Sequence, residues 1–222
     1  MIFTIDRLLD NDAYQYHINQ HHSNIQINLE SEFFMPHHFE LQVGQEAGMT
    51  PLYFNLDGTE SRLEVANNPF KLKPEPTVDG VTKCITGKAF IGNVVFDIKY
   101  CQAKGKGLFG GYMYYEIENG SDTYKIYDVN QGIKGRNFCI YLNEQLIAIA
   151  KFTHLGYSGA IYTIYSENNI DPHILTILIM FSDAVILRNN DGQSALFVVL
   201  PKEIKNKYDS TFVDKIITQD GQ

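Results

Sequence analysis

Cysteine is scarce in this chain, with three residues among 222. Cys84, Cys101 and Cys139 lie far apart, are odd in number, and show no pair at the C-x-x-C spacing of zinc sites or thiol-exchange enzymes. This pattern disfavours a scaffold held together by disulfides and a thiolate metal site. The number and spacing of the cysteines are best explained by reduced thiols, and we expect a cytoplasmic protein.

A long apolar run is also missing. The longest nearly uncharged stretch, residues 174–187, contains Asp183 and is shorter than the roughly 20 apolar residues that a bilayer span needs. At the start of the chain, Asp6 and Arg7 stand where a secretory peptide would hold its apolar stretch. The sequence therefore predicts no transmembrane span and no export signal.

Positive charge is in deficit. The chain carries 18 basic and 26 acidic side chains, for a formal net charge of −8. This balance disfavours general attraction to nucleic acid or to anionic lipid surfaces, so any such contact requires a local basic patch. No internal repeat and no low-complexity tract is found. We expect no nucleic-acid partner.

What is present is typical of one globular, β-rich domain. Apolar residues make up 44% of the chain and charged residues 20%, and there are 14 Tyr and 14 Phe. Aromatic side chains in this number favour strands over a helical bundle. All-β folds of this length are commonly undivided. We expect a single domain over residues 1–222, with a barrel and central helix at about 1–187 and a C-terminal extension at 188–222.

Short strands separated by turn signals fill the first 165 residues. Residues 52–56 and 62–65 flank Asp57-Gly58, which predicts a hairpin. Further strands are predicted at 88–100, 112–118, 124–129, 138–142 and 146–152. Asn119-Gly120 and Asn143-Glu144 provide tight turns between neighbouring strands, whereas the two prolines of residues 71–77 indicate a connection or an edge. Consecutive antiparallel hairpins favour a barrel or sandwich.

One segment breaks this pattern. Asp171-Pro172 is typical of a helix start, and residues 174–187 are apolar at nearly every position. Such a helix has to be covered on all sides, which a β-rich chain achieves by curling around it. Two buried strands remain an alternative for this segment. Beyond it, residues 195–200 resemble a strand and residues 203–217 have a mixed, partly helical pattern.

Strands that end in a wholly apolar helix, introduced by Asp-Pro, resemble the tubby C-terminal-like superfamily and, within it, the LURP-one-related proteins. The likeness is carried by residues 124–129 (Tyr-Lys-Ile-Tyr-Asp-Val), 138–152, 162–165 and 169–183, where Asp183 matches an aspartate near the helix end. The resemblance implies a closed antiparallel β-barrel of about twelve strands around one buried C-terminal helix. Phospholipid scramblases, related to that superfamily, carry an acidic calcium segment before the helix. Only residues 167–171 stand there, so calcium-driven scrambling is not expected.

The glycine pattern and the histidines do not indicate catalysis. Residues 105–110 match G-x-G-x-x-G, but the following residues form a predicted strand instead of a helix, and no kinase partner motif follows. His21-His22 and His37-His38, with His17, offer at most one metal ligand per pair on a strand, and exposed turn histidines are the simpler interpretation.

Two further positions are assigned structural roles. Residues 156–160 fall one residue short of G-x-S-x-G and are interpreted as a loop. Asp183, inside the apolar helix, is interpreted as a buried aspartate satisfied by backbone amides. We therefore predict no catalytic residue, no cofactor and no metal site.

Two glycine-rich loops at 104–111 and 132–135 carry basic residues, and they are the candidate ligand site. In an antiparallel barrel they could lie at one end, where Lys104, Lys106, Lys134 and Arg136 would converge and backbone amides could approach a phosphate. Solvated loop charges are the simpler interpretation. The resemblance implies recognition of phosphoinositide headgroups by basic side chains on the barrel surface.

Two functions stay open: a non-enzymatic binding or scaffold protein that recognises an anionic lipid headgroup or a protein partner, and an enzyme whose site is assembled from scattered residues.

Overall fold

The computed structural model describes residues 1–10, 13–21, 31–33, 49–56, 59–66, 75–76, 80–104, 111–130, 135–155, 159–189 and 202–221. The strands are β1 (Ile2–Asp10), β2 (Ala13–His21), β3 (Ser31–Phe33), β4 (Met49–Leu56), β5 (Thr59–Ala66), β6 (Glu75–Pro76), β7 (Thr82–Ile91), β8 (Val94–Lys104), β9 (Gly111–Asn119), β10 (Asp122–Asn130), β11 (Arg136–Leu142), β12 (Gln145–Leu155) and β13 (Gly159–Ser166). The helices are α1 (Pro172–Asn189), α2 (Lys202–Lys205) and α3 (Ser210–Asp220). The expectation of a mostly β chain with an apolar helix near its C-terminus is confirmed.

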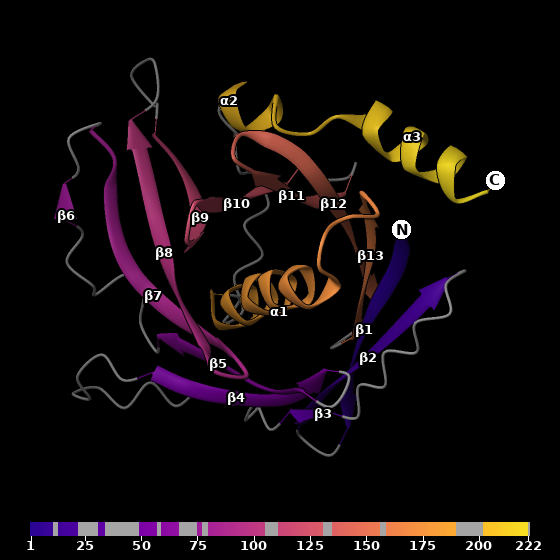
Figure 1. The fold of residues 1–222 in the computed structure, drawn as a ribbon, viewed down its shortest axis with the longest axis horizontal. Helices are drawn as coiled ribbons and strands as arrows, with labels where there is room; N and C mark the ends of the chain where they lie inside the picture. The colour runs from indigo at the N-terminus through magenta and orange to yellow at the C-terminus, as the bar shows by residue number, and fades with distance from the viewer. Residues whose placement is uncertain are drawn as a thin grey trace.

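The strands form one antiparallel sheet that curls around α1 (Figure 1). Strands β7 to β13 follow one another as hairpins, β1 returns to pair with β13, and the order runs from β3 at one end to β4 at the other. The described residues of β3 and β4 form no ladder, although their Cα atoms come within 8 Å. Closure requires such a ladder, and β3 has only three residues. The closed barrel of about twelve strands is therefore not confirmed.

Helix α1 lies inside the curled sheet. Its cap is Asp171, whose Oδ1 accepts a hydrogen bond from the His173 backbone N at 2.8 Å. Residues 175–183 are all buried. They pack against apolar side chains on the concave side of the sheet, here called the inner face, which include Phe3, Ile98 and Ile140. The predicted helix is confirmed, and the alternative of two buried strands is wrong. The helix is apolar all round because the sheet surrounds it.

Most turn predictions hold, and one strand prediction is wrong. The β4–β5 register pairs Leu56 with Thr59, so only two residues connect this hairpin, as expected. Gly120 (φ 61°), and Asn143 and Glu144 (φ 47° and 69°), adopt the positive φ values of tight turns. The single strand predicted at 88–100 is instead two strands. Gly92, with φ 54°, begins a turn between β7 and β8 that the apolar residues on both sides obscure in the sequence.

The convex side of the sheet, here called the outer face, carries α2 and α3 (Figure 1). Asp209 caps α3, since its side chain accepts a hydrogen bond from the Thr211 backbone N at 2.9 Å. A second apolar cluster lies beneath the two helices and joins Ile204, Phe212, Val213 and Ile216 to Tyr127, Cys139 and Ile149. The helical expectation for 203–217 is confirmed in part. The strand-like stretch 195–200 lies outside the described residues.

Candidate functional site

The strand ends beside the two basic loops lie along one border of the sheet. This border is formed by the ends of strands, not by an edge strand, and is here called the loop edge. Lys104, the last residue of β8, pairs with Gly111, the first of β9. Asn130, the last of β10, pairs with Arg136, the first of β11. Because β9 and β10 are antiparallel neighbours, all four ends occupy the same edge. Strands β8 and β11 are three spacings apart, so Lys104 and Arg136 are separated by about 14 Å along the sheet.

Arg136 is anchored by an acidic partner. Its Nε donates hydrogen bonds to both carboxylate oxygens of Asp128, at 2.9 and 3.1 Å, and its Nη2 also donates to Asp128. Burial disfavours the charged guanidinium, but the bonds to Asp128 outweigh it and hold the pKa of Arg136 above its usual range. The guanidinium group of Arg136 is therefore held in position and is already paired with one carboxylate. Only 23% of its side chain is exposed.

The structure does not place the whole predicted set. Lys106 and Lys134 lie outside the described residues, and for Lys104 the structure gives the backbone position alone. Lys99, on the outer face, is paired with Glu118 at 2.6 Å, and this hydrogen bond lowers the pKa of Glu118. The strand ends that flank the two loops lie at the loop edge. That the four predicted side chains converge on one ligand stays a prediction.

Lys83 provides a second ion pair on the outer face near the loop edge. Its Nζ lies 2.5 Å from the Glu116 carboxylate, which is almost fully buried. Burial works against the charge of Lys83, but the hydrogen bond and the charge of Glu116 raise its pKa. With Lys99 and Glu118, this pair forms a balanced set of charges beside the loop edge.

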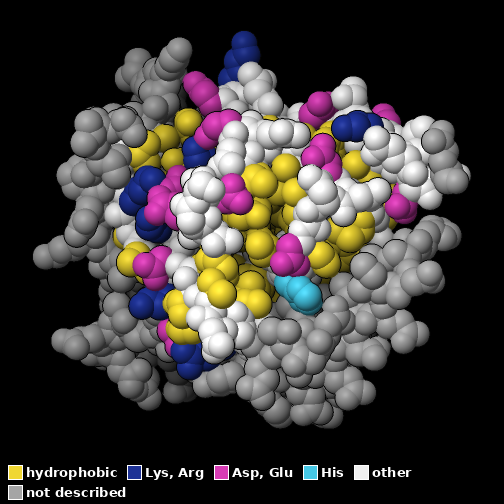
Figure 2. Space-filling view, in the orientation of Figure 1, with side chains coloured by type: hydrophobic (Ala, Val, Ile, Leu, Met, Phe, Trp, Pro, Cys, Tyr) yellow, Lys and Arg dark blue, Asp and Glu magenta, His cyan; other side chains and the backbone are white. Residues whose placement is uncertain are grey.

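The opposite edge of the sheet, here called the turn edge, carries a shallow pocket. This edge is formed by the turns at 92–93, 120–121 and 143–144. Figure 2 shows apolar side chains gathered near the centre of the visible face, with carboxylates among them. The pocket is a depression with room for about one water molecule, and it is lined by Ala89, Ile91, Phe96, Ile117, Asn119, Tyr124, Ile174 and Ile177. Its exposed lining is apolar.

Asp183 lies at the heart of a buried polar cluster. Its carboxylate accepts hydrogen bonds from Arg7 of β1 and Tyr162 of β13, and all three residues are at most 4% exposed. The prediction that Asp183 is buried is confirmed. The partners shown are side chains instead of the expected backbone amides, and they lie far away in the sequence. The cluster joins α1 to β1 and β13, the two strands that pair although they lie far apart in the sequence.

Burial protects the cysteines. Cys101 and Cys139 are fully buried, and burial raises the pKa of each thiol to about 12.

Within the described ranges, no three His, Cys, Asp or Glu side chains gather closely enough to hold a metal ion. His17 and His21 lie on β2, whereas His22, His37, His38 and residues 156–158 fall outside the described residues. Over the part of the chain that is described, no helix has the length and apolar character needed to cross a bilayer.

The sequence analysis did not predict the pocket. Its lining comes from β7, β8, β9, β10 and α1, and no local motif joins these segments. Asp171, which lies beside it, was predicted only as a helix cap, and Asp122 was not singled out. The available signal was the position of each residue next to a predicted turn or helix start.

Comparisons with family models, with curated proteins and with solved structures find no match to this chain. The function is therefore inferred from the chain's own geometry.

Proposed function

We propose that the protein is a non-enzymatic binding or scaffold protein of tubby-like type that recognises an anionic lipid headgroup at the loop edge. The observation that carries the proposal is the position of the strand ends. Lys104 and Arg136 stand at the same edge, and the chain passes from one strand to the next through the two glycine-rich, basic loops. The ligand residues proposed are Lys104, Lys106, Lys134 and Arg136.

The arrangement of α1 supports a surface site. Apolar side chains of α1 and of the inner face fill the interior, including Leu178, Phe181 and Ile140. The pocket lined by described residues contains one titratable side chain, Tyr124. An enzyme typically gathers several polar groups with perturbed pKa values in its deepest pocket, whereas a scaffold is filled and binds on its surface. A sheet curled around a buried helix is also the arrangement that the tubby-like resemblance implies.

Charge explains why the site must be local. At a net charge of −8, the protein as a whole is repelled by an anionic membrane. Each lysine or arginine held near such a surface contributes about 1 kcal/mol. Several of them at one edge are therefore needed to overcome the general repulsion. Arg136, held by Asp128, contributes less than a free arginine, and so the lysines should dominate.

Vesicle co-sedimentation tests the proposal. Phosphatidylcholine vesicles that contain a phosphoinositide should sediment the protein, whereas pure phosphatidylcholine vesicles should not, and added salt should weaken the binding. The Lys104→Ala/Lys106→Ala variant should bind about thirtyfold more weakly, because two headgroup contacts worth about 1 kcal/mol each are lost. A soluble inositol phosphate should compete if the headgroup itself is recognised.

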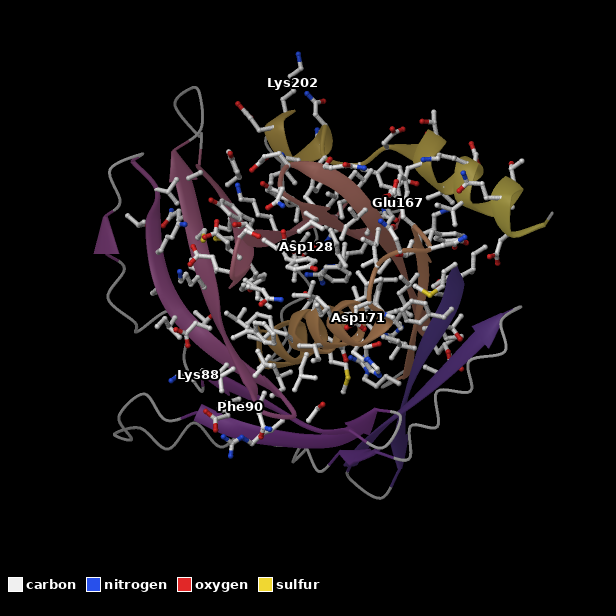
Figure 3. The ribbon with its side chains drawn as sticks, in the orientation of Figure 1. Lys88, Phe90, Asp128, Glu167, Asp171 and Lys202 are labelled. Atoms are coloured by element: carbon white, nitrogen blue, oxygen red, sulfur yellow. The ribbon has the colours of Figure 1, made fainter. Side chains whose placement is uncertain are left out.

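Lys202→Ala/Lys205→Ala is the matched control. It removes the same charge from exposed positions of α2, and Lys202 points away from the body of the protein (Figure 3). This variant should retain the binding of the parent protein. Equal sedimentation with both kinds of vesicle, or equal losses in the two double variants, would contradict the proposal and favour a protein partner.

A further inference from the structure

Two carboxylates lie beside the pocket of the turn edge. Asp122 follows the β9–β10 turn, and Asp171 caps α1, where Figure 3 shows it at the start of the helix. Burial, reinforced by the negative charges of Asp122 and Asp171, raises the pKa of Tyr124. Because Tyr124 lines the pocket, both carboxylates act on the same small region.

Within the described residues, the side-chain partners of these two carboxylates are an asparagine amide and a histidine ring. Asp122 accepts a hydrogen bond from the Asn143 amide at 3.1 Å, and Asp171 lies 3.1 Å from Nδ1 of His173. Among the described residues, no lysine or arginine side chain lies within 4.0 Å of either one. By contrast, Glu144 at the same edge is paired with Lys125, and Glu167 lies 3.6 Å from Lys215. Asp122 and Asp171 therefore remain available to a cation from outside.

Apolar surface continues from the pocket onto the rim of the turn edge. Ile91 lines the pocket and pairs with Val94 across the β7–β8 hairpin. Val94 is 50% exposed, so the apolar surface extends beyond the pocket. The turn edge thus combines an apolar depression, an apolar rim and two carboxylates.

We propose that the turn edge binds a cationic peptide segment of a partner protein. An apolar side chain of that segment would lie over the shallow pocket and against Val94, while a neighbouring lysine or arginine would pair with Asp122 and Asp171. Charge complementarity selects this occupant, because the two carboxylates and the net charge of −8 repel anionic membranes and fatty acids and attract cations. The turn edge lies opposite the loop edge, so this inference does not depend on lipid binding there.

Fluorescence anisotropy at low salt tests the proposal with the full chain. The probe is a fluorescein-labelled, end-capped hexapeptide of alternating leucine and lysine. One control peptide carries serine in place of leucine, and another carries glutamate in place of lysine. The leucine–lysine peptide should bind at least tenfold more tightly than either control, because the site requires both an apolar group and a positive charge.

Variants locate the binding. Asp122→Asn/Asp171→Asn removes both charges, and asparagine still suits a turn and a helix cap. This variant should bind the leucine–lysine peptide at least fivefold more weakly, with an unchanged circular dichroism spectrum. The matched variant Asp97→Asn/Asp214→Asn removes the same charge from β8 and α3 and should bind within twofold of the parent protein.

Three results would overturn the proposal. One is equal binding of the serine–lysine and leucine–lysine peptides, which would indicate general charge attraction. Another is an equal loss in the two double variants. The third is self-association that Asp122→Asn/Asp171→Asn abolishes, without peptide binding, because the occupant would then be a second copy of this chain.

Discussion

Gly87 illustrates how closely α1 and the sheet are packed. This glycine lies at a register shift in β7, and a Cβ atom there would fall 2.6 Å from Cε2 of Phe181 and 2.7 Å from the carbonyl oxygen of Glu64. Neither distance is tolerated by real side chains, and one of the two atoms belongs to the backbone. The absence of a side chain at residue 87 therefore allows the buried helix to approach the strand.

We expect Gly87→Ala to destabilise the protein by about 1–3 kcal/mol, as overpacking typically does. Urea denaturation followed by circular dichroism measures this change. Gly111→Ala is the control, because a Cβ at this strand glycine would meet its nearest atom at 3.4 Å, close to ordinary contact. Similar stability losses in the two variants would show that the contact with Phe181 is not the cause.

At the scale of elements, Lys207 fastens the C-terminal helices to the outer face. Its ammonium group lies 4.4 Å from the ring centre of Tyr127 and 4.6 Å from that of Tyr141. The Tyr141 hydroxyl donates a hydrogen bond to the Lys207 carbonyl at 2.9 Å, and the Glu144 carboxylate lies 4.0 Å from the ammonium group. One residue between α2 and α3 thus makes three kinds of contact with β10, β11 and the following turn.

Lys207→Ala should loosen α2 and α3 without unfolding the sheet. Loss of the cation–π contacts costs about 0.5–2 kcal/mol, which is enough to raise the open population of a peripheral element several-fold. Hydrogen exchange measured by mass spectrometry should then speed up within residues 202–221 and stay unchanged in β11 and β12. Lys205→Ala, at an exposed position of α2, should leave exchange as it is. Unchanged protection in Lys207→Ala would disprove this role.

At the scale of the whole molecule, we expect buried and half-buried tyrosines to set the alkaline limit of stability. Burial is the largest cause of a raised phenol pKa at Tyr100, Tyr114, Tyr115, Tyr124, Tyr127, Tyr141 and Tyr208. For Tyr141 the pKa rises to about 12. In the unfolded chain these phenols ionise near pH 10, whereas in the folded protein they keep their protons.

The sign of the pH effect follows from this difference. Below about pH 10 both states hold the phenol protons, so stability does not depend on them. Above that pH, only the unfolded state releases protons, and each such group lowers the free energy of unfolding by about 1.4 kcal/mol per pH unit. Lys83, whose pKa is also raised, loses its stabilising charge in the same direction.

We therefore expect cooperative unfolding within one to two pH units above about pH 10. Tyrosinate absorbance and circular dichroism, recorded on the same sample, should change together. The chain contains no tryptophan, which leaves tyrosine as the dominant chromophore. Gradual tyrosine ionisation that is complete before the circular dichroism signal changes would show that these phenols are accessible in the folded state.

Local chemistry explains which elements were predicted correctly. Asp171-Pro172 fixes the start of α1 by itself, since the capping bond and the proline act within one turn. Asn119-Gly120 and Asn143-Glu144 predicted turns because glycine and asparagine tolerate positive φ, and Gly120, Asn143 and Glu144 have positive φ in the structure. The turn at Gly92 was missed since Ile91 and Val94 continue an apolar pattern across it, and a buried strand has the same pattern.

The candidate sites were only partly accessible from sequence. Basic residues beside glycines identified the loop edge, but the pairing of Arg136 with Asp128 depends on the β10–β11 register, which sets these side chains beside each other. The pocket required five elements to meet, so no window of sequence contained it. Likewise, only the fold shows that Arg7 and Tyr162 are the partners of Asp183.

The sequence by itself determined the strand-rich character, most turns, the apolar helix and the need to surround that helix, because side-chain periodicity and turn chemistry act over a few residues. Only the tertiary structure decided how the sheet is ordered, that β1 returns to pair with β13, and that β3 and β4 form no ladder among the described residues. Long-range strand pairing is decided by backbone hydrogen bonds and by packing against α1, and these contacts join residues that have no local relation in the chain.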